Sequence, residues 1–390
     1  MHPHREYSRI HELIQTTMKQ LWTQLTLGTL LVLCLIIPPA HLQATTSIDD
    51  ARITTRLRNM SQIIPSDFST RAKGYVKGYL YHRDDTEKLL GKTARYFPIF
   101  EFFLDNYNLP EELKYLPIIE SRLRPYAYST AGAGGMWQFT TPTARHVGLK
   151  VNRYLDERRD PHKSTKAALK YLAYLHEQFD SWEFALAAYN CGEGRVRKAM
   201  ARAGSRSFKK VLPYLPKETQ LYVPKFLAGQ YICRYYMEHG LVPQLPPADL
   251  LHTQTVMVYK AYSMFKISNV TGVHIKTLKV LNPAYYDNYI PASQTGNYLT
   301  VPQRSFALLI DYVSEKEGWK PFARHRKTGY YATKWIVGKG DTLEKLAALC
   351  GATKYQIMQW NNLRTSELYN GQILHLYYAV PTVQTTGPKA

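Results

Sequence analysis

Cysteine is scarce in this chain, with four residues in 390. No two of them have the close spacing of a zinc site, and so few cannot form a disulfide framework. We therefore expect neither a metal nor another cofactor. Whether Cys191 and Cys233 pair in an oxidising compartment is left open by the sequence.

Acidic residues are also few. Asp and Glu number 30 against 50 Lys and Arg, which gives a net charge of +20. Such a chain favours an anionic partner, either nucleic acid or the surface of a cell envelope. The sequence contains no helix-turn-helix, zinc-finger or RNA-binding signature. We therefore expect no nucleic-acid partner and an anionic envelope surface instead.

Long apolar runs are absent apart from residues 25–37, LTLGTLLVLCLII. This run is short for a membrane span and suits the core of a signal peptide, with a plausible cleavage site after Ala44. Leu33 before Cys34 is not the small residue that a lipoprotein signal requires. We predict that residues 1–44 are a signal peptide or membrane anchor. The protein would then be exported to the periplasm or cell envelope, with possible membrane association through this N-terminus.

Aromatic residues are abundant, at 13% with 31 Tyr, so most of the chain should fold. Residues 45–95 have scattered helical periodicity and are interpreted as an N-terminal helical arm. Residues 96–240 are helical in pattern with few strand signals. Asp160 and Ser181 are expected to cap two of these helices, and prolines at 246–247 mark a linker.

Glu120 has an unusual position. A helix is predicted from Pro110 to Ser121, with Leu113 and Leu116 on its apolar face, and Glu120 follows Leu113 by seven residues. A carboxyl group on an apolar face should have a raised pKa, as a general acid requires. Alternatively, Glu120 ends its helix and points to solvent. A glycine-rich loop, STAGAGGMWQF, follows and can approach a ligand closely.

Three short segments decide between these interpretations. Glu120-Ser121, GGMWQF at 134–139 and AYNCGEGRV at 188–196 resemble, in order and spacing, the soluble lytic transglycosylase catalytic domain. Trp137, DERRDP at 156–161 and TQLYVPK at 219–225 resemble the membrane-bound lytic murein transglycosylase D subgroup. The resemblance implies a lysozyme-like, mainly helical catalytic domain over residues 96–240.

The resemblance also implies an enzyme that cleaves peptidoglycan between N-acetylmuramic acid and N-acetylglucosamine, with formation of a 1,6-anhydro end. Glu120 would act alone, first as acid and then as base. None of the other acidic residues considered is a convincing second carboxylate; these are Asp156, Glu157, Asp160, Glu183 and Glu193. The alternatives are a lysozyme-type hydrolase and a non-catalytic peptidoglycan-binding protein.

Substrate contacts follow from the same resemblance. Ser121 lies beside the acid, Gln138 and Asn190 carry amides suited to sugar groups, and Tyr222 would hydrogen-bond near the acid. Met136 and Tyr189 would form the apolar wall of the cleft, although core packing explains these two equally well. For Trp137, core packing is the better interpretation.

The C-terminal part contains an internal repeat with a constant offset of 79 residues, for example Val258 with Val337 and Gly272 with Gly351. The second copy, residues 334–378, resembles a LysM module, a βααβ unit that binds glycans containing N-acetylglucosamine. Asp341 and Thr353 should cap its helices. The resemblance points to five glycan-binding residues: Gly340, Asp341, Thr342, Asn362 and Leu363.

The first copy, residues 251–303, has Ala261-Tyr262 where the second has Gly340-Asp341. It is interpreted as a degenerate LysM-like module, and glycan binding by it is left open. Residues 304–333, with RHRK at 324–327, are expected to be a basic connector facing the anionic envelope, and 379–390 a tail. The fold class predicted for the chain is therefore α+β and multidomain.

Overall fold

In the computed structural model, the described residues belong to one compact unit, Asp50–Ala390. The structure describes residues 50–64, 68–318, 330–337, 341–350, 354–361, 363, 365–369 and 372–379. The segment expected to be a signal peptide or anchor, and most of the expected tail, lie outside these residues. No helix in the described part of the chain is long and apolar enough to cross a membrane.

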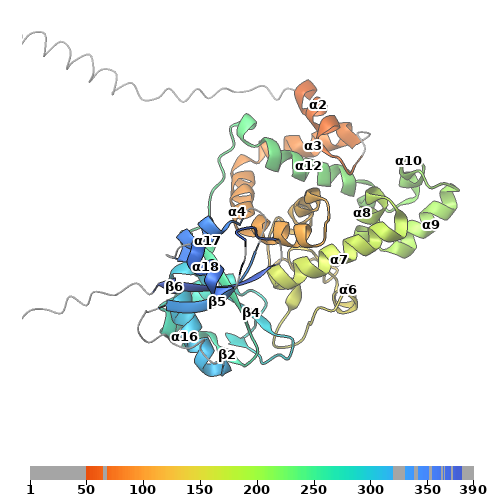
Figure 1. The fold of residues 1–390 in the computed structure, drawn as a ribbon. Coiled ribbons are helices and arrows are strands. Elements are labelled where there is room, and N and C mark those ends of the chain that lie inside the picture. Colours follow the sequence, from red (N-terminus) through yellow and green to blue (C-terminus); the bar gives the residue numbers. More distant parts are fainter. Residues whose placement is uncertain are drawn as a thin grey trace, which may run out of the picture. The chain divides into compact units, whose positions relative to one another are not determined.

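Three helices form the N-terminal part of the described chain: α2 (Asp50–Met60), α3 (Ser69–Tyr81) and α4 (Arg83–Asn106). Their buried side chains belong to the same hydrophobic core as those of residues 107–241. The longest, α4, runs through residue 95, where the sequence suggested the end of an arm. Figure 1 shows α3 beside α12 (Tyr222–Tyr235), in agreement with the contacts between these two helices.

Helices shorter than α4 make up the rest of this helical domain. They are η2 (Glu111–Tyr115), α5 (Leu116–Ser121), α6 (Thr141–His146), η3 (Glu157–Arg159), α7 (Pro161–Phe179), α8 (Trp182–Cys191), α9 (Glu193–Ala203), α10 (Phe208–Val211), η4 (Leu212–Tyr214), α11 (Lys217–Gln220), α12 and η5 (Met237–His239). The caps expected at Asp160 and Ser181 are confirmed. The Asp160 carboxylate accepts from the amides of His162 and Lys163, and the Ser181 hydroxyl accepts from that of Phe184.

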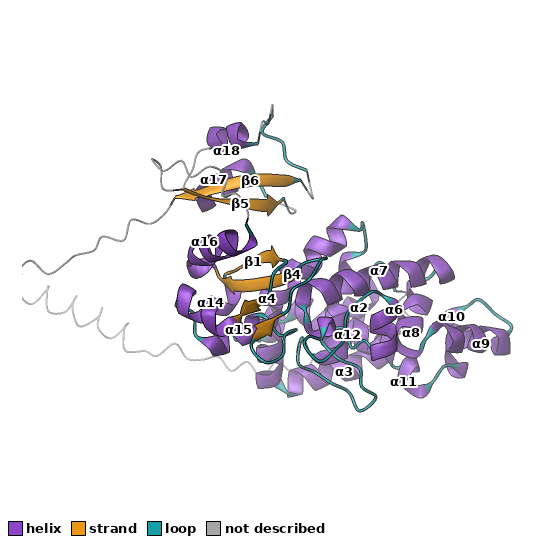
Figure 2. Cartoon of the chain, turned by 90° about the horizontal axis from the view of Figure 1, so that it is seen from below, coloured by secondary structure: helices purple, strands orange, loops and turns teal. Residues whose placement is uncertain are grey.

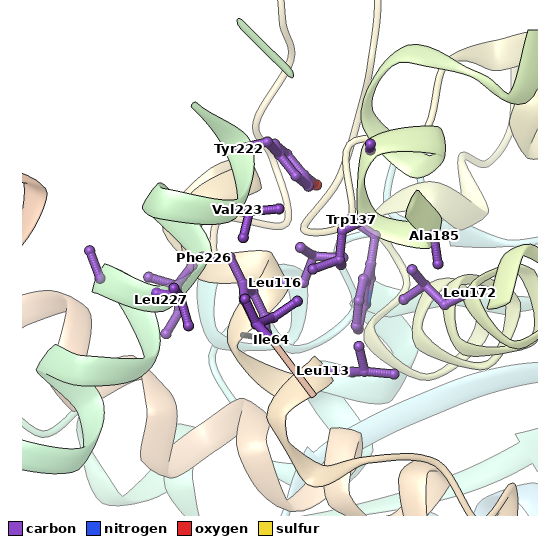
Figure 3. Close-up of a cluster of buried hydrophobic side chains, with 14 of the residues drawn as sticks. Ile64, Leu113, Leu116, Trp137, Leu172, Ala185, Tyr222, Val223, Phe226 and Leu227 are labelled. Atoms are coloured by element: carbon purple, nitrogen blue, oxygen red, sulfur yellow. The ribbon is translucent and has the colours of Figure 1, made fainter. Parts of the chain in front are cut away.

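The core of this domain surrounds α5. Leu113, Leu116 and Phe226 are fully buried, and Figure 3 shows them with Trp137 and Val223 in one cluster. The indole nitrogen of Trp137 donates to the Thr165 hydroxyl at 2.9 Å. Its expected role in packing is confirmed, and this cluster fixes the helix that carries Glu120.

The first C-terminal module follows a four-residue helix, α13 (Ala248–Leu251). It contains β1 (Thr253–Val258), β2 (Tyr262–Ser263), α14 (Met264–Thr271), α15 (Ile275–Leu281), β3 (Tyr289–Ile290), β4 (Asn297–Pro302), η6 (Gln303–Ser305) and α16 (Phe306–Glu317). Strands β1 and β4 pair antiparallel, from Thr253 opposite Pro302 to Val258 opposite Asn297, as Figure 2 shows. Helix α16 lies in the segment expected to be a connector, yet its Leu309 and Val313 are part of the module's buried core.

The second module is a βααβ unit. It consists of β5 (Tyr330–Ile336), α17 (Leu343–Cys350), α18 (Lys354–Trp360) and β6 (Ile373–Ala379), with β5 and β6 antiparallel. The cap predicted at Asp341 is one residue off. The hydroxyl of Thr342, directly before α17, accepts from the Lys345 amide, because the capping side chain must precede the first helical residue. The predicted cap Thr353 lies outside the described residues.

Candidate active site

The segment before Glu120 is two short helices instead of the single helix predicted from Pro110. Residues 111–115 form a 3₁₀ helix, and α5 covers only Leu116–Ser121. Pro117 explains the break, because it has no N–H to donate to the carbonyl four residues earlier. Arg122 and Leu123 then adopt left-handed backbone conformations, both with φ of 54°, which turn the chain sharply after Ser121.

Glu120 lies near the end of α5 and is partly buried. Burial raises the pKa of its carboxyl group to about 7, as the apolar face of the predicted helix indicated. The negative charge of Glu218 adds to this rise in pKa. A hydrogen bond from Tyr222 and the positive charge of Lys225 lower the pKa, but they do not offset burial. Near neutral pH the group therefore exists in both protonation states.

Two tyrosines from different helices lie close to this carboxyl group. Tyr222, at the start of α12, donates its hydroxyl to Oε1 of Glu120. Tyr189, on α8, donates its hydroxyl to the carbonyl of Trp137 at 2.8 Å. Burial and the negative charge of Glu120 raise the pKa of both phenols well above its ordinary value, so both remain hydrogen-bond donors. Helices α5, α8 and α12 thus meet at Glu120.

The other predicted contact residues differ in how accessible they are. Asn190 is partly buried, and its Oδ1 accepts from the Thr219 hydroxyl at 2.7 Å. Gln138 is also partly buried, has a left-handed backbone with φ of 51°, and donates its amide to the Gly135 carbonyl at 2.7 Å. The amides of both residues are therefore held in fixed positions.

Ser121 and Met136 are buried instead. The Ser121 hydroxyl donates to the Met136 carbonyl at 2.9 Å and accepts from the Arg124 amide, so it ties the end of α5 to the glycine-rich loop. The Met136 side chain has no exposed surface. This favours the packing interpretation for Met136, and it gives Ser121 a positioning role.

Glu218 is a site residue that sequence reasoning missed. It is exposed, lies on α11 and contributes to the raised pKa of Glu120. Glu218 precedes Tyr222 by four residues, and this spacing places two side chains on the same side of a continuous helix. Once Tyr222 was a candidate, that spacing was the available signal.

The glycine-rich loop is held against η3. A Cβ on Gly135 would lie 1.8 Å from the Arg158 carbonyl oxygen, so only glycine fits. The Arg158 guanidinium donates to the carbonyls of Gly132 and Phe139 and pairs with Asp156 at 2.7 Å. An ion pair is therefore present within DERRDP, and it fixes the loop that carries Gln138.

The candidate glycan-binding residues of the second module are only partly described. Gly340 and Asn362 lie outside the described residues. Asp341 and Thr342 lie at the start of α17, and Leu363 follows α18 with its amide donating to the Met358 carbonyl at 2.9 Å. Leu363 is half-buried against the module's core.

Comparison with protein families gives three matches along the chain. Residues 98–212 match the transglycosylase SLT domain. Residues 252–316 match the LysM-like domain of lytic transglycosylase MltD, and residues 336–376 match the LysM domain. Helix α16 falls almost entirely within the second match.

Individual proteins give a consistent result. The chain is 36% identical over 275 residues to membrane-bound lytic murein transglycosylase D of Escherichia coli strain K12, which covers 68% of this chain and 60% of that protein. It is 38% identical over 114 residues to membrane-bound lytic murein transglycosylase F of Shewanella loihica, which covers 25% of this chain and 22% of that protein. The crystal structure of the 70 kDa soluble lytic transglycosylase of Escherichia coli matches with 24% identity and a TM-score of 0.34, over 50% of this chain and 34% of that one.

The chain thus spans about 60% of the length of the curated transglycosylase D that it matches. The order of the domains, first SLT, then the MltD-type LysM-like domain, then LysM, is the order of the described folds. The chain therefore belongs to the SLT-domain lytic murein transglycosylases of the membrane-bound D type.

Proposed function

We propose that this protein is a lytic transglycosylase of peptidoglycan. It cleaves the β-1,4 bond between N-acetylmuramic acid and N-acetylglucosamine and leaves a 1,6-anhydromuramoyl end. The observation that carries the proposal is the carboxyl group of Glu120, whose pKa of about 7 lets it donate and accept a proton near neutral pH. The family matches supply the substrate class.

Glu120 acts in two steps. In its protonated form it gives its proton to the glycosidic oxygen, and the bond between that oxygen and the anomeric carbon breaks. The acetamido group of the muramoyl residue stabilises the positive charge that develops on this carbon. The Glu120 carboxylate then takes the proton of the muramoyl 6-hydroxyl, whose oxygen attacks the anomeric carbon. The carboxyl group returns to its starting state, and no water is consumed.

The neighbouring residues assist this cycle. Tyr222 donates to Oε1 of Glu120, so it holds the carboxyl group in place and stabilises the carboxylate between the two steps. The amides of Gln138 and Asn190 are fixed by hydrogen bonds to Gly135 and Thr219, which suits them to orient sugar hydroxyl and acetamido groups. Tyr189 lies against the same site.

A second candidate is a lysozyme-type hydrolase, and one observation favours it. The Glu218 carboxylate is close enough to Glu120 to raise its pKa, so the site does contain a second acidic group. A hydrolase would use such a group to activate water or to stabilise the sugar cation. Glu218 is exposed, whereas Glu120 is shielded, and we therefore assign it an electrostatic role only.

The products distinguish the two candidates. Purified peptidoglycan is digested, and the fragments are analysed by mass spectrometry. A lytic transglycosylase releases anhydro-ended fragments, whereas a hydrolase releases fragments with reducing ends. The Glu120→Gln variant should lose at least 10³-fold in rate, a loss on the order expected for an essential acid–base residue. Anhydro fragments released by this variant at the wild-type rate would overturn the assignment of Glu120.

The second module would add affinity for the substrate. We assign glycan binding to Asp341, Thr342 and Leu363, together with Gly340 and Asn362, because they match the LysM resemblance in position. The net charge of +20 would favour the anionic envelope, to which the N-terminal segment would direct the chain. Deleting residues 334–378 should weaken sedimentation with intact sacculi, and the Glu120→Gln protein should still sediment.

A further inference from the structure

The first C-terminal module is docked on the catalytic domain. Leu155, from the loop before η3, is 5% exposed and belongs to the module's own hydrophobic core. The Asp156 amide donates to the Ala284 carbonyl at 2.8 Å, and the Tyr286 amide donates to the Tyr154 carbonyl at 3.0 Å. The two chain segments therefore pair as a short antiparallel bridge.

A lysine held by an ion pair reinforces this junction. Lys163 binds Glu157 at 2.6 Å and also donates to the Gly296 carbonyl at 2.9 Å. Arg95 donates to the Val280 carbonyl at 3.0 Å. Because backbone, side-chain and core contacts all cross the junction, residues on its two sides are held at fixed distances.

Three tyrosines lie together at this junction. Tyr126 and Tyr128 come from the loop after Glu120, and Tyr286 comes from the module. The hydroxyls of Tyr128 and Tyr286 are 3.3 Å apart. The Arg159 guanidinium lies 4.4 Å from the ring centre of Tyr126 and 5.1 Å from that of Tyr286. We call these three residues the junction tyrosines.

The junction tyrosines are unusually exposed for side chains with so many contacts. Tyr126 is 47% exposed and Tyr128 is 50% exposed, and Tyr286 is partly exposed. Two of their hydroxyls are held by the protein, Tyr126 by the Lys279 carbonyl at 2.7 Å and Tyr128 by the Asp156 carboxylate at 2.6 Å. The hydroxyl groups thus fix the rings, whose faces are open to solvent. A ligand that packs on these faces would therefore cost little side-chain entropy.

This aromatic cluster is linked to the catalytic centre through one residue. The Gln138 amide, which the proposed mechanism uses to orient the substrate, also approaches the Ala127 carbonyl at 3.4 Å. Ala127 stands between Tyr126 and Tyr128 in the chain. The backbone that carries Tyr126 and Tyr128 is therefore joined directly to Gln138.

Arg159 provides a second observation. Its side chain is 8% exposed, and its Nε is buried without a hydrogen-bond partner among the described residues. The Nε–H is enclosed by the protein, and the guanidinium carries its positive charge beside the rings of Tyr126 and Tyr286. Sugar rings suit such a site, because they offer a face of C–H groups to the tyrosines and electron-rich oxygens to the positive charge beside them.

We propose that the junction tyrosines form a glycan-binding subsite, shared by the catalytic domain and the first module, that holds the peptidoglycan strand beyond the cleavage site. This inference rests on the proposed function for the identity of the glycan. The repeat supports the shared arrangement, because Ala284 is the residue 79 positions before Leu363. In the second module, Leu363 belongs to the proposed glycan site. In the first module, the corresponding segment at Ala284 binds the catalytic domain instead.

The test compares two double variants with one control. Tyr126→Leu with Tyr286→Leu removes the flat rings but keeps apolar bulk, whereas Tyr126→Phe with Tyr286→Phe keeps the rings. The control is Tyr81→Leu, at a residue that is 82% exposed and has no contact with the cluster. Binding of peptide-free glycan strands is measured by titration calorimetry in the Glu120→Gln background, and KM and kcat for strand cleavage are measured with Glu120 present.

The leucine pair should raise Kd and KM about tenfold, with a smaller change in kcat, since each sugar face covers several tens of Å² of ring. The phenylalanine pair and Tyr81→Leu should stay within about twofold of the parent. Equal behaviour of the leucine pair and the control would overturn the subsite. Failure of the proposed function would show separately, as an absence of anhydro fragments from the otherwise unchanged protein.

Discussion

Glu120 has two neighbours that shift the pKa of its carboxyl group in opposite directions. Tyr222 lowers the pKa by its hydrogen bond to the carboxylate, and Glu218 raises it by its negative charge. Glu120 must be protonated to start the cycle. We therefore expect kcat/KM to have its maximal value below about pH 7 and to fall above it. The falling limb of the pH profile therefore reports the pKa of this one group.

The two neighbours can be removed separately. Glu218→Gln takes away a like charge, so the pKa of Glu120 should decrease and the falling limb should move to lower pH. Tyr222→Phe removes a donor to the carboxylate, so the limb should move to higher pH while kcat decreases. The measurement is kcat/KM against pH on soluble glycan strands. If the falling limbs of the two variants move in the same direction, this account of the site is contradicted.

The same burial should cost stability. The pKa of Glu120 is about 7 in the folded chain against an ordinary 4.5, so the folded state binds more protons between these values. Stability from this group is therefore present at low pH and is lost as the pH rises through about 7. The full shift corresponds to about 3 kcal/mol, and we expect about 2 kcal/mol because the group is partly exposed.

Glu120→Gln does not titrate. Relative to the natural protein, its free energy of unfolding should therefore increase by about 2 kcal/mol between pH 4 and pH 8. Urea unfolding at the two pH values measures this difference, with Glu177→Gln, at an exposed position on α7, as the control. A constant difference across this range would show that Glu120 is not held in a destabilised state.

At the scale of an element, the glycine-rich loop depends on a close approach between its backbone and η3. Gly135 has φ of +80° and no room for a Cβ against the Arg158 carbonyl, whereas Gly132 has φ of +75° and nothing within 4 Å. Gly135→Ala should cost about 3 kcal/mol or more and displace Gln138. Gly132→Ala should cost only about 1 kcal/mol, the backbone term alone. Urea unfolding and kcat/KM of the pair measure both effects, and equal losses would contradict the close approach.

Short-range patterns predicted the elements around the site better than the contacts between them. The caps at Asp160 and Ser181 follow from side chains that bond to amides two or three residues away, so the sequence contains all the information. The two-part helix before Glu120 was missed because the apolar spacing was given more weight than Pro117. The raised pKa of Glu120 was predictable from its face of the helix. Glu218 was missed, because its four-residue spacing to Tyr222 became a signal only once Tyr222 was itself a candidate.

Contacts between distant segments set the limit at the scale of the whole molecule. The repeat of 79 residues revealed two modules of one kind, and both are present. The repeat did not reveal that, among the described residues, only the first module shares a hydrophobic core with the catalytic domain. Leu155 lies about 100 residues before the core that it enters, and nothing in the DERRDP segment indicates that partner. Helix α16 was likewise read as a connector because its charged residues obscured the buried face of Leu309 and Val313.

This difference in attachment predicts how the chain unfolds. The catalytic domain and the first module share Leu155 and the Lys163 contacts, so they should unfold together. Among the described residues, the buried core of the second module contains only its own side chains, from Val337 to Leu376, so it should unfold separately. Differential scanning calorimetry of the whole chain should therefore show two transitions, the larger one for the joined pair.

Leu155→Ala tests the shared core directly. Truncating this buried leucine should cost about 2 to 4 kcal/mol, and the loss should appear in the larger transition only. Leu308→Ala, at a position that is 49% exposed on α16, is the matched control and should leave both transitions nearly unchanged. If the larger transition of Leu155→Ala splits in two, the docking contacts are what couple the module to the catalytic domain. If its temperature instead stays at the wild-type value, Leu155 does not contribute to a common core, and the junction tyrosines lose the support that holds them in place.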